Sequence, residues 1–77
     1  MPEIPLHHLS VGSTARIQNF HGSKNLSTKL RQYGLFIGDQ VRLLRMAPFK
    51  GPILIEVNGR EIALGYGIAA KIMVEPL

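Results

Sequence analysis

The dipeptide Asn58-Gly59 constrains the fold of this chain more than any other feature of its sequence. It separates two short runs rich in isoleucine and leucine, residues 53–57 and 61–64. Asn-Gly between two such runs predicts a β-hairpin with a type I′ turn, because both turn residues must take positive φ. The turn also fixes the register, which places Glu56 opposite Glu61 as a mildly unfavourable pair of like charges. The pairs expected on the core side are Ile55 with Ile62 and Ile53 with Leu64.

Upstream of the hairpin, apolar side chains recur at helical spacing. Leu26, Leu30 and Tyr33 stand at positions i, i+4 and i+7, which is the pattern of a short amphipathic helix. Either Ser23 or Asn25 can cap its first turn, since both side chains can accept a hydrogen bond from a backbone N–H. A helix of this length is not stable by itself, so it must pack against a sheet.

A glycine marks the end of this helix. With Gly34 at the first position beyond the helix, Leu30 and Leu35 become the two residues whose side chains touch in a Schellman motif. The pair Gly38-Asp39 then predicts a turn into the next strand. The residues expected to form the structural framework are Leu30, Gly34, Leu35, Gly38, Asn58 and Gly59.

Three further segments alternate in the manner of strands: residues 14–20, 40–46 and 72–75. In the second of these, the alternation slips at Leu43-Leu44, which indicates a bulge or burial of both faces. Residues 1–5 contain two prolines and predict a loose N-terminal arm.

The predicted order of elements is a strand, a short helix, three strands of a meander, one helical turn at residues 68–70 and a last strand. Five short strands, each with one face to bury, favour a closed barrel in a chain of 77 residues. We therefore expect a mostly β fold: a small five-stranded SH3-like barrel with one short α-helix between the first and second strands. A single domain over residues 1–77 is expected. An OB-type barrel is the alternative, although its strands are usually longer.

Composition narrows the class of protein. The chain has no cysteine, so neither a disulfide framework nor a zinc-thiolate site is available. No apolar run approaches the roughly 20 residues of a membrane helix, and residues 1–5 lack the basic-then-apolar pattern of a signal peptide. A cytoplasmic location is therefore expected. The formal net charge of +4 favours acidic partners, although the Lys and Arg residues are scattered along the chain.

The sequence contains no recognisable catalytic constellation. It has no cysteine nucleophile, no Ser-His-acid spacing and no glycine-rich loop ahead of a helix that could hold a phosphate. The close pair of carboxylates, Glu56 and Glu61 across the hairpin, has the character of a solvated surface pair. We predict that the chain is not an enzyme and needs no cofactor.

His7, His8 and His21 are the nitrogen ligands that a metal ion could use. Adjacent histidines on an extended chain point to opposite sides, and a specific transition-metal site needs several ligands held by further contacts. Exposed surface histidines are therefore the favoured interpretation, with weak metal binding of no fixed stoichiometry as the expected behaviour.

A protein-binding role fits the sequence better than nucleic-acid binding. The latter requires a basic groove with stacking aromatic rings, and only Phe49 beside Lys50 has that character, so weak and sequence-blind binding is expected. The same pair lies in a loop stiffened by two prolines, where an aromatic ring can anchor a protein partner. The alternative is that Phe49 covers the open end of the barrel. The residues predicted to contact a partner are Lys29, Gln32, Pro48, Phe49, Lys50 and Pro52.

Several groups of residues together resemble the bacterial FeoA family. The resemblance covers residues 6–75, and its specific part is a Gly-Leu-x-x-Gly step combined with an Ala-Pro-x-x-Gly-Pro loop. The residues that carry it are Leu6, Leu9, Gly12, Ala15-Arg16-Ile17, Leu30, Tyr33-Gly34-Leu35, Gly38, Val41, Ala47-Pro48, Gly51-Pro52, Ile62-Ala63-Leu64, Ala69, Ile72 and Val74-Glu75.

The resemblance implies an SH3-like barrel and a small cytoplasmic protein of ferrous iron uptake. It also implies a partner, FeoB, a membrane transporter with a cytosolic G domain, and membrane contact only through that partner. The barrel is similar to the C-terminal domain of iron-dependent repressors of the diphtheria toxin repressor type, so a detached module of that type, or a weak nucleic-acid-binding barrel, is the alternative. Two positions depart from the family: Ile37 stands where proline is frequent, and residues 65–67 stand where many members carry charges.

Overall fold

The computed structural model describes residues 3–77 and places the Asn58-Gly59 turn between β4 (Ile53–Val57) and β5 (Arg60–Leu64). The two turn residues have φ of 51° and 77°. Glu56 lies opposite Glu61, and the isoleucines and leucine pair on the core side as predicted. The hairpin and its register are therefore confirmed.

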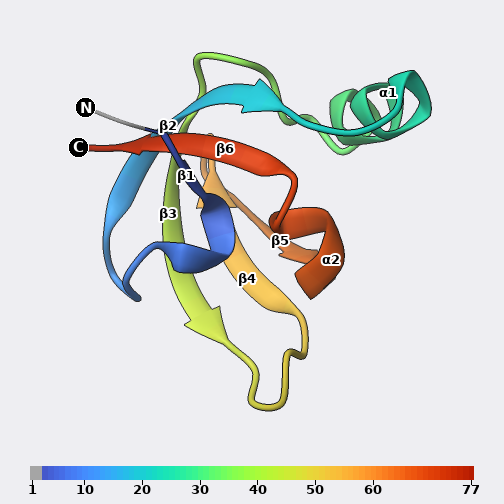
Figure 1. The fold of residues 1–77 in the computed structure, drawn as a ribbon. Coiled ribbons are helices and arrows are strands. Elements are labelled where there is room, and N and C mark those ends of the chain that lie inside the picture. The colour runs from blue at the N-terminus through green and yellow to red at the C-terminus, as the bar shows by residue number, and fades with distance from the viewer. Residues whose placement is uncertain (1–2) are drawn as a thin grey trace.

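In the described part of the chain six strands form one antiparallel sheet, in the order β1-β6-β2-β3-β4-β5 (Figure 1). The fold is mostly β, with helix α1 (Lys24–Gln32) between β2 and β3. The register between β3 and β4 shifts between Leu43 and Arg45, which favours a bulge over the alternative of burial on both faces. The strands outside the hairpin are β1 (Ile4–Pro5), β2 (Thr14–Phe20), β3 (Gln40–Met46) and β6 (Ile72–Pro76).

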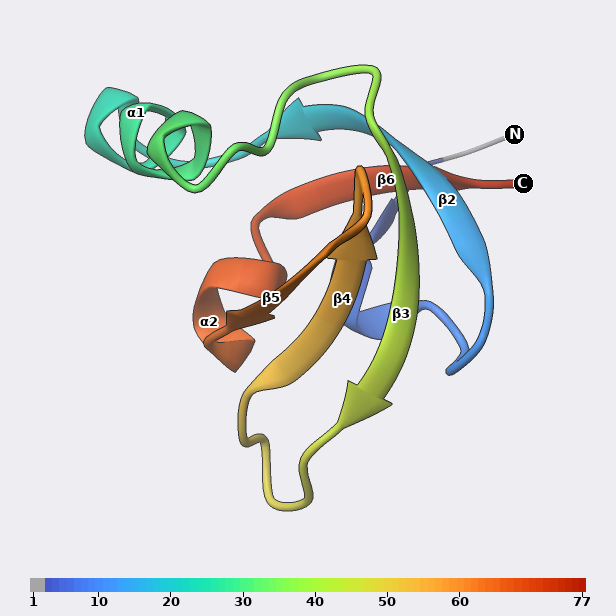
Figure 2. The same ribbon diagram turned by 180° about the vertical axis from the view of Figure 1, so that it is seen from behind.

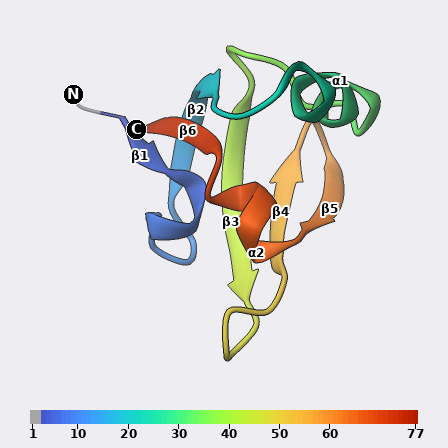
Figure 3. The same cartoon turned by 45° about the vertical axis from the view of Figure 1, so that its right-hand side comes forward.

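Two details of the predicted barrel are wrong: residues 3–77 form six strands rather than five, and the sheet that they build is not closed. Ile4 and Pro5, expected within a loose arm, pair with β6 as an edge strand, where proline is tolerated because its nitrogen needs no partner. Met1 and Pro2 of that expected arm lie outside the described residues. Within residues 3–77 the edge strands β1 and β5 do not pair with each other. On that side the short helices η1 (Leu6–His8) and α2 (Tyr66–Ala69) contact one another instead (Figure 3).

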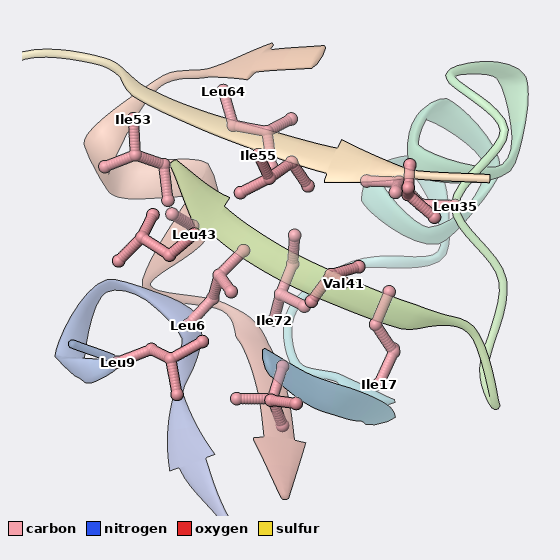
Figure 4. Packing of buried hydrophobic residues seen from close by; sticks show 14 of the residues in the cluster. Leu6, Leu9, Ile17, Leu35, Val41, Leu43, Ile53, Ile55, Leu64 and Ile72 are labelled. Atoms are coloured by element: carbon pink, nitrogen blue, oxygen red, sulfur yellow. The ribbon is translucent and has the colours of Figure 1, made fainter. Parts of the chain in front are cut away.

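The core lies inside the curved sheet. Among the described residues every buried side chain in it is apolar, and side chains from η1, β3, β4 and β6 gather in one cluster (Figure 4). Full burial of one Leu, Ile or Val side chain contributes about 1.5–3 kcal/mol. The buried residues are Leu6, Leu9, Ala15, Ile17, Leu30, Leu35, Val41, Leu43, Ile53, Ile55, Val57, Leu64, Ala69, Ile72 and Val74.

Helix α1 begins after Ser23. The Ser23 side-chain oxygen accepts a hydrogen bond from the Leu26 N–H at 3.3 Å, so Ser23 is the N-cap and Asn25 lies within the helix. Of the helical residues, Leu30 is buried, and it ties the helix to the core. None of the helices in residues 3–77 combines the length and hydropathy that crossing a membrane requires.

The end of α1 is the predicted Schellman motif. The Leu35 N–H donates to the Leu30 carbonyl at 3.0 Å, and the Gly34 N–H donates to the Arg31 carbonyl at 2.9 Å. Gly34 has φ of 86°, a left-handed conformation that favours glycine. The Arg60 guanidinium adds two longer bonds, each 3.4 Å, to the carbonyls at the helix end, which links the hairpin to α1.

Strand β3 connects the two ends of the molecule. It starts after the turn at residues 36–39, at the same end of the molecule as α1, and ends at the loop of residues 47–52 (Figure 2). A strand of seven residues spans about 20 Å. The 47–52 loop therefore lies at the far end of the molecule from α1.

Candidate functional site

The 47–52 loop is a tight turn closed by two backbone hydrogen bonds. The Gly51 N–H donates to the Pro48 carbonyl at 3.1 Å, and the Ala47 N–H donates to the Pro52 carbonyl at 3.0 Å. Phe49 and the following lysine both have φ of 59°, as the two central residues of a type I′ turn require. The turn thus has the geometry that Asn-Gly adopts easily, but a phenylalanine and a lysine occupy it.

Phe49 projects fully into solvent from this turn. Its side chain is 99% exposed, so the alternative in which it covers an open end of the barrel is wrong. The left-handed conformation costs a residue with a Cβ atom about 1–2 kcal/mol. The chain therefore bears two unfavourable features at one position, an exposed aromatic ring and a strained backbone, and a binding role would account for both.

The predicted contact residues form two groups rather than one surface. Pro48, Lys50 and Pro52 are exposed beside Phe49 on the loop. The other two, Lys29 and Gln32, are exposed on α1 at the opposite end (Figure 2). A partner that touched both groups would have to extend along the whole molecule.

Beside α1, the structure brings together five residues that were not predicted as contact residues. They line a hollow of about 310 Å³, here named the α1 groove. Two large apolar side chains stand exposed at it, Phe36 at 49% and Ile37 at 61%. The lining residues are Phe20, Ser27, Arg31, Phe36 and Ile37.

A network of hydrogen bonds holds the 36–39 turn in place. The Asp39 carboxylate accepts from the Phe36 N–H at 3.0 Å, and the Asp39 N–H donates to the Phe36 carbonyl at 3.0 Å. Towards β2, the Gly38 N–H donates to the Ile17 carbonyl and the Ile17 N–H to the Asp39 carbonyl, each at 2.8 Å. The Arg16 guanidinium donates to the Gly38 carbonyl at 3.0 Å. These bonds fix the turn between α1 and β3, so the exposure of its two apolar side chains is built into the fold.

One sequence signal could have located this groove. Leu35, Phe36 and Ile37 are three consecutive apolar residues in a turn that is too short to bury all of them. Leu35 is fully buried, which leaves its two neighbours outside. The remaining lining residues come from β2 and α1 and join the groove only through the tertiary fold, which local sequence patterns do not reveal.

The histidines do not assemble into a metal site in the structure. Within residues 3–77 no group of three or more His, Cys, Asp or Glu side chains could hold a metal ion. His21 lies after β2, where its backbone N–H donates to the Lys71 carbonyl at 2.7 Å. Weak metal binding, and the lack of a cofactor, remain predictions.

His7 and His8 lie close together rather than on opposite sides. Because they share the tight turn η1 instead of an extended strand, their ring centroids are 4.3 Å apart. The His7 ring also packs edge-on against Tyr66 at 4.7 Å. Its Nδ1 atom is buried with no hydrogen-bond partner among the described residues. Burial lowers the pKa of His7 below its usual range, and the neighbouring His8 lowers it further.

Comparisons with known proteins agree with the fold. The FeoA domain model matches residues 4–76. A protein of Methanocaldococcus jannaschii named Fe(2+) transport protein A is 31% identical over 71 residues, which are 92% of this chain and 84% of that protein. A crystal structure of an iron uptake regulatory protein, FeoA, is 32% identical and covers 100% of both chains with a TM-score of 0.87.

A crystal structure of ScaR with bound Zn²⁺ is 30% identical, with a TM-score of 0.87, over 96% of this chain and 37% of the ScaR chain. The predicted SH3-like class is confirmed by these likenesses, with the corrections to strand number and closure given above. The family consists of small accessory domains of ferrous iron transport and is not a known enzyme family. By its match over residues 4–76 and its identity to these relatives, the chain belongs to the FeoA domain family.

Proposed function

We propose that this chain is a non-enzymatic accessory protein of ferrous iron uptake that works in the cytoplasm. Its partner is the cytosolic region of a FeoB-type transporter, a membrane protein with a cytosolic G domain. Membership of the FeoA domain family supports a role in iron transport. The formal net charge of +4 favours an acidic partner surface.

The observation that carries this proposal is the exposure of Phe49 on a closed turn. An aromatic ring that enters a pocket on a partner accounts for about 2 kcal/mol or more of binding free energy. The turn is already closed by its own backbone bonds, so little conformational entropy is lost on binding. Lys50 next to the ring supplies a cation for the polar rim, and the exposed Lys29 and Gln32 on α1 offer a second contact.

Calorimetry with the isolated cytosolic region of the transporter tests this proposal. We expect saturable binding that weakens as salt is added, because the protein is basic. Cells that lack the chain should take up ferrous iron more slowly, and expression of the wild-type chain should restore the rate. If both proteins are folded and no heat of binding is detected, the proposed partner is wrong.

A second candidate function is a detached module of iron-dependent repressor type. A structure described as a manganese-dependent transcriptional repressor favours it, since it shares this fold over 99% of this chain with a TM-score of 0.90 at 21% identity. Such a module would belong to a DNA-bound assembly. Submicromolar binding to one DNA sequence at physiological salt would make this the better assignment, whereas weak and sequence-blind binding would leave the transporter as the partner.

A further inference from the structure

The α1 groove is a second exposed apolar site, at the opposite end of the molecule from Phe49. It is lined by three large apolar residues, Phe20, Phe36 and Ile37, and by two residues of α1, Ser27 and Arg31. Its volume of about 310 Å³ lies at the lower limit of small-molecule pockets, so it suits one large side chain.

The surroundings of the groove are basic. Helix α1 contains no acidic residue, and it carries Lys24 and Arg31 on the same face as Ser27, whereas Lys29 lies on the opposite face. On the turn, the Asp39 carboxylate accepts the Phe36 N–H, so its negative charge is partly engaged by the backbone. The Arg16 guanidinium donates a hydrogen bond to the Gly38 carbonyl of the same turn. An apolar hollow that is bordered by cations fits a ligand whose apolar group is flanked by carboxylates.

We propose that the α1 groove receives a large apolar side chain from an acidic segment of a protein partner. That this partner is the transporter rests on the proposed function. That the groove binds an apolar side chain from an acidic segment does not. The 36–39 turn is held by five hydrogen bonds in which residues 16, 17, 36, 38 and 39 take part. Because the turn is preorganised, the groove can bind without an ordering step.

A protein segment fits this site better than a nucleic acid. Single-stranded nucleic acids bind to grooves in which several cations follow the phosphate backbone. Here Arg31 is the charged residue among the five that line the hollow, and an aliphatic side chain, Ile37, forms part of its wall. These features match the apolar centre and polar rim of protein interfaces.

Two blocked synthetic peptides test the chemistry. The first has a leucine-phenylalanine-leucine centre flanked by glutamates, and the second has the same centre flanked by lysines. Titration of isotope-labelled protein, followed by NMR, should shift the signals of Phe20, Ser27, Arg31, Phe36 and Ile37 with the acidic peptide. The lysine peptide should bind at least about tenfold more weakly.

Matched variants separate the groove from the rest of the surface. Ile37→Ser and Arg31→Glu should each weaken binding of the acidic peptide by about tenfold or more. Val11→Ser replaces a side chain that is 60% exposed, which is close to the exposure of Ile37. Val11 lies in a different region, next to Gly12, whose N–H donates to the Leu43 carbonyl of β3. Val11→Ser and the charge control Arg45→Glu lie away from the groove and should bind the peptide as the wild type does.

Several results would overturn the proposal. They are equal affinities for the two peptides, shifts outside the groove, no shifts with either peptide, or groove variants that bind like the wild type. Tighter binding of a single-stranded oligonucleotide to the same residues would replace the acidic segment by a nucleic acid.

The same variants, titrated with the cytosolic region of the transporter, keep the two proposals apart. If that region binds and Ile37→Ser has no effect, the groove inference fails and the proposed function stands. If the acidic peptide binds in the groove and the transporter region does not bind, the proposed partner fails and the groove chemistry stands.

Discussion

The two ends of this molecule expose apolar side chains by different means. At one end, Phe49 stands on a turn that is closed by its own two backbone bonds and has a left-handed backbone. At the other end, Phe36 and Ile37 stand on a turn bonded to β2, next to Leu35, which is fully buried. The loop can therefore change without disturbing the fold, while the α1 end combines core and surface within a few residues.

This difference separates two kinds of binding surface. The 47–52 loop is a local structure, and its sequence could be exchanged with little effect on the remainder of the chain. The α1 groove depends on β2, α1 and the 36–39 turn together, so its shape is coupled to global stability. Substitutions that compare the two ends should show this coupling directly.

The largest effect is expected at the α1 end, from Leu35→Ala. Removal of this fully buried side chain should cost about 2–5 kcal/mol. A domain of this size has a stability of about 5 kcal/mol, so much of the protein should be unfolded. Urea unfolding followed by circular dichroism measures the change. Ile37→Ala, two residues away but exposed, should change stability by less than about 0.5 kcal/mol, and a similar loss in both variants would remove the distinction between core and surface at this end.

The next effect concerns the end of α1. Gly34→Ala should cost about 1–2 kcal/mol, because alanine is strained at a φ of 86° and its Cβ would meet the Arg60 guanidinium. Gly67→Ala is the matched control, since Gly67 lies in α2 with open space around its Cα atom. In thermal melts, the midpoint of Gly34→Ala should be lower than that of the wild type, and the midpoint of Gly67→Ala should not be lower. An unchanged midpoint for Gly34→Ala would be incompatible with a left-handed cap.

A third change should act in the opposite direction, at the loop end. Replacement of Phe49 by Asn together with Lys50 by Gly gives the turn the residues that favour positive φ. The double variant should be more stable by about 1 kcal/mol and should lose the aromatic anchor. Asn58→Ala, at a φ of 51° in the other type I′ turn, should instead lower stability. A double variant no more stable than the wild type would show that the loop stores no backbone strain.

The smallest effect is a dependence of stability on pH. Because the pKa of His7 in the folded protein is below its ordinary value, the unfolded chain binds its proton more readily. The contribution of neutral His7 to the free energy of unfolding should be fully present above a pH of about 6.5, the ordinary pKa of histidine. It should be lost as the pH falls through the lower pKa of His7 in the folded state. The loss of stability at low pH should be smaller in His7→Gln than in the wild type, whereas His21→Gln should lose as much stability as the wild type. Urea unfolding at pH 7.5 and pH 5.5 compares the variants, and identical curves for His7→Gln and the wild type would contradict the assignment.

Features that depend on neighbouring residues could be predicted from the sequence. The Asn58-Gly59 hairpin, the cap at Gly34 and the bulge after Leu43 each follow from local backbone chemistry, and the structure contains all three. The edge strand at Ile4-Pro5 could not be predicted, because two residues carry no periodicity and proline indicates a loop. Its pairing depends on β6, which is about 70 residues away along the chain.

The candidate site shows the same division. The exposed aromatic on the proline loop could be predicted, since the two prolines and Gly51 mark the loop directly. The large separation between that loop and Lys29 could not be predicted from the sequence, because it depends on the direction in which β3 runs through the fold. The α1 groove combines Phe20 of β2 with Phe36 and Ile37 of a later turn, and because these two segments are distant in sequence, the groove could be located only from the fold.

The most direct test of the account is a measurement of folding and binding on the same variant, Phe49→Ala. The free energy of unfolding should change by less than about 0.5 kcal/mol, because the ring is 99% exposed. The Kd for the cytosolic region of the transporter should rise by about thirtyfold, which corresponds to about 2 kcal/mol. Loss of folding would show that Phe49 supports the domain. A folded variant with an unchanged Kd would contradict the assignment of the loop as the anchor and leave the α1 end as the contact surface.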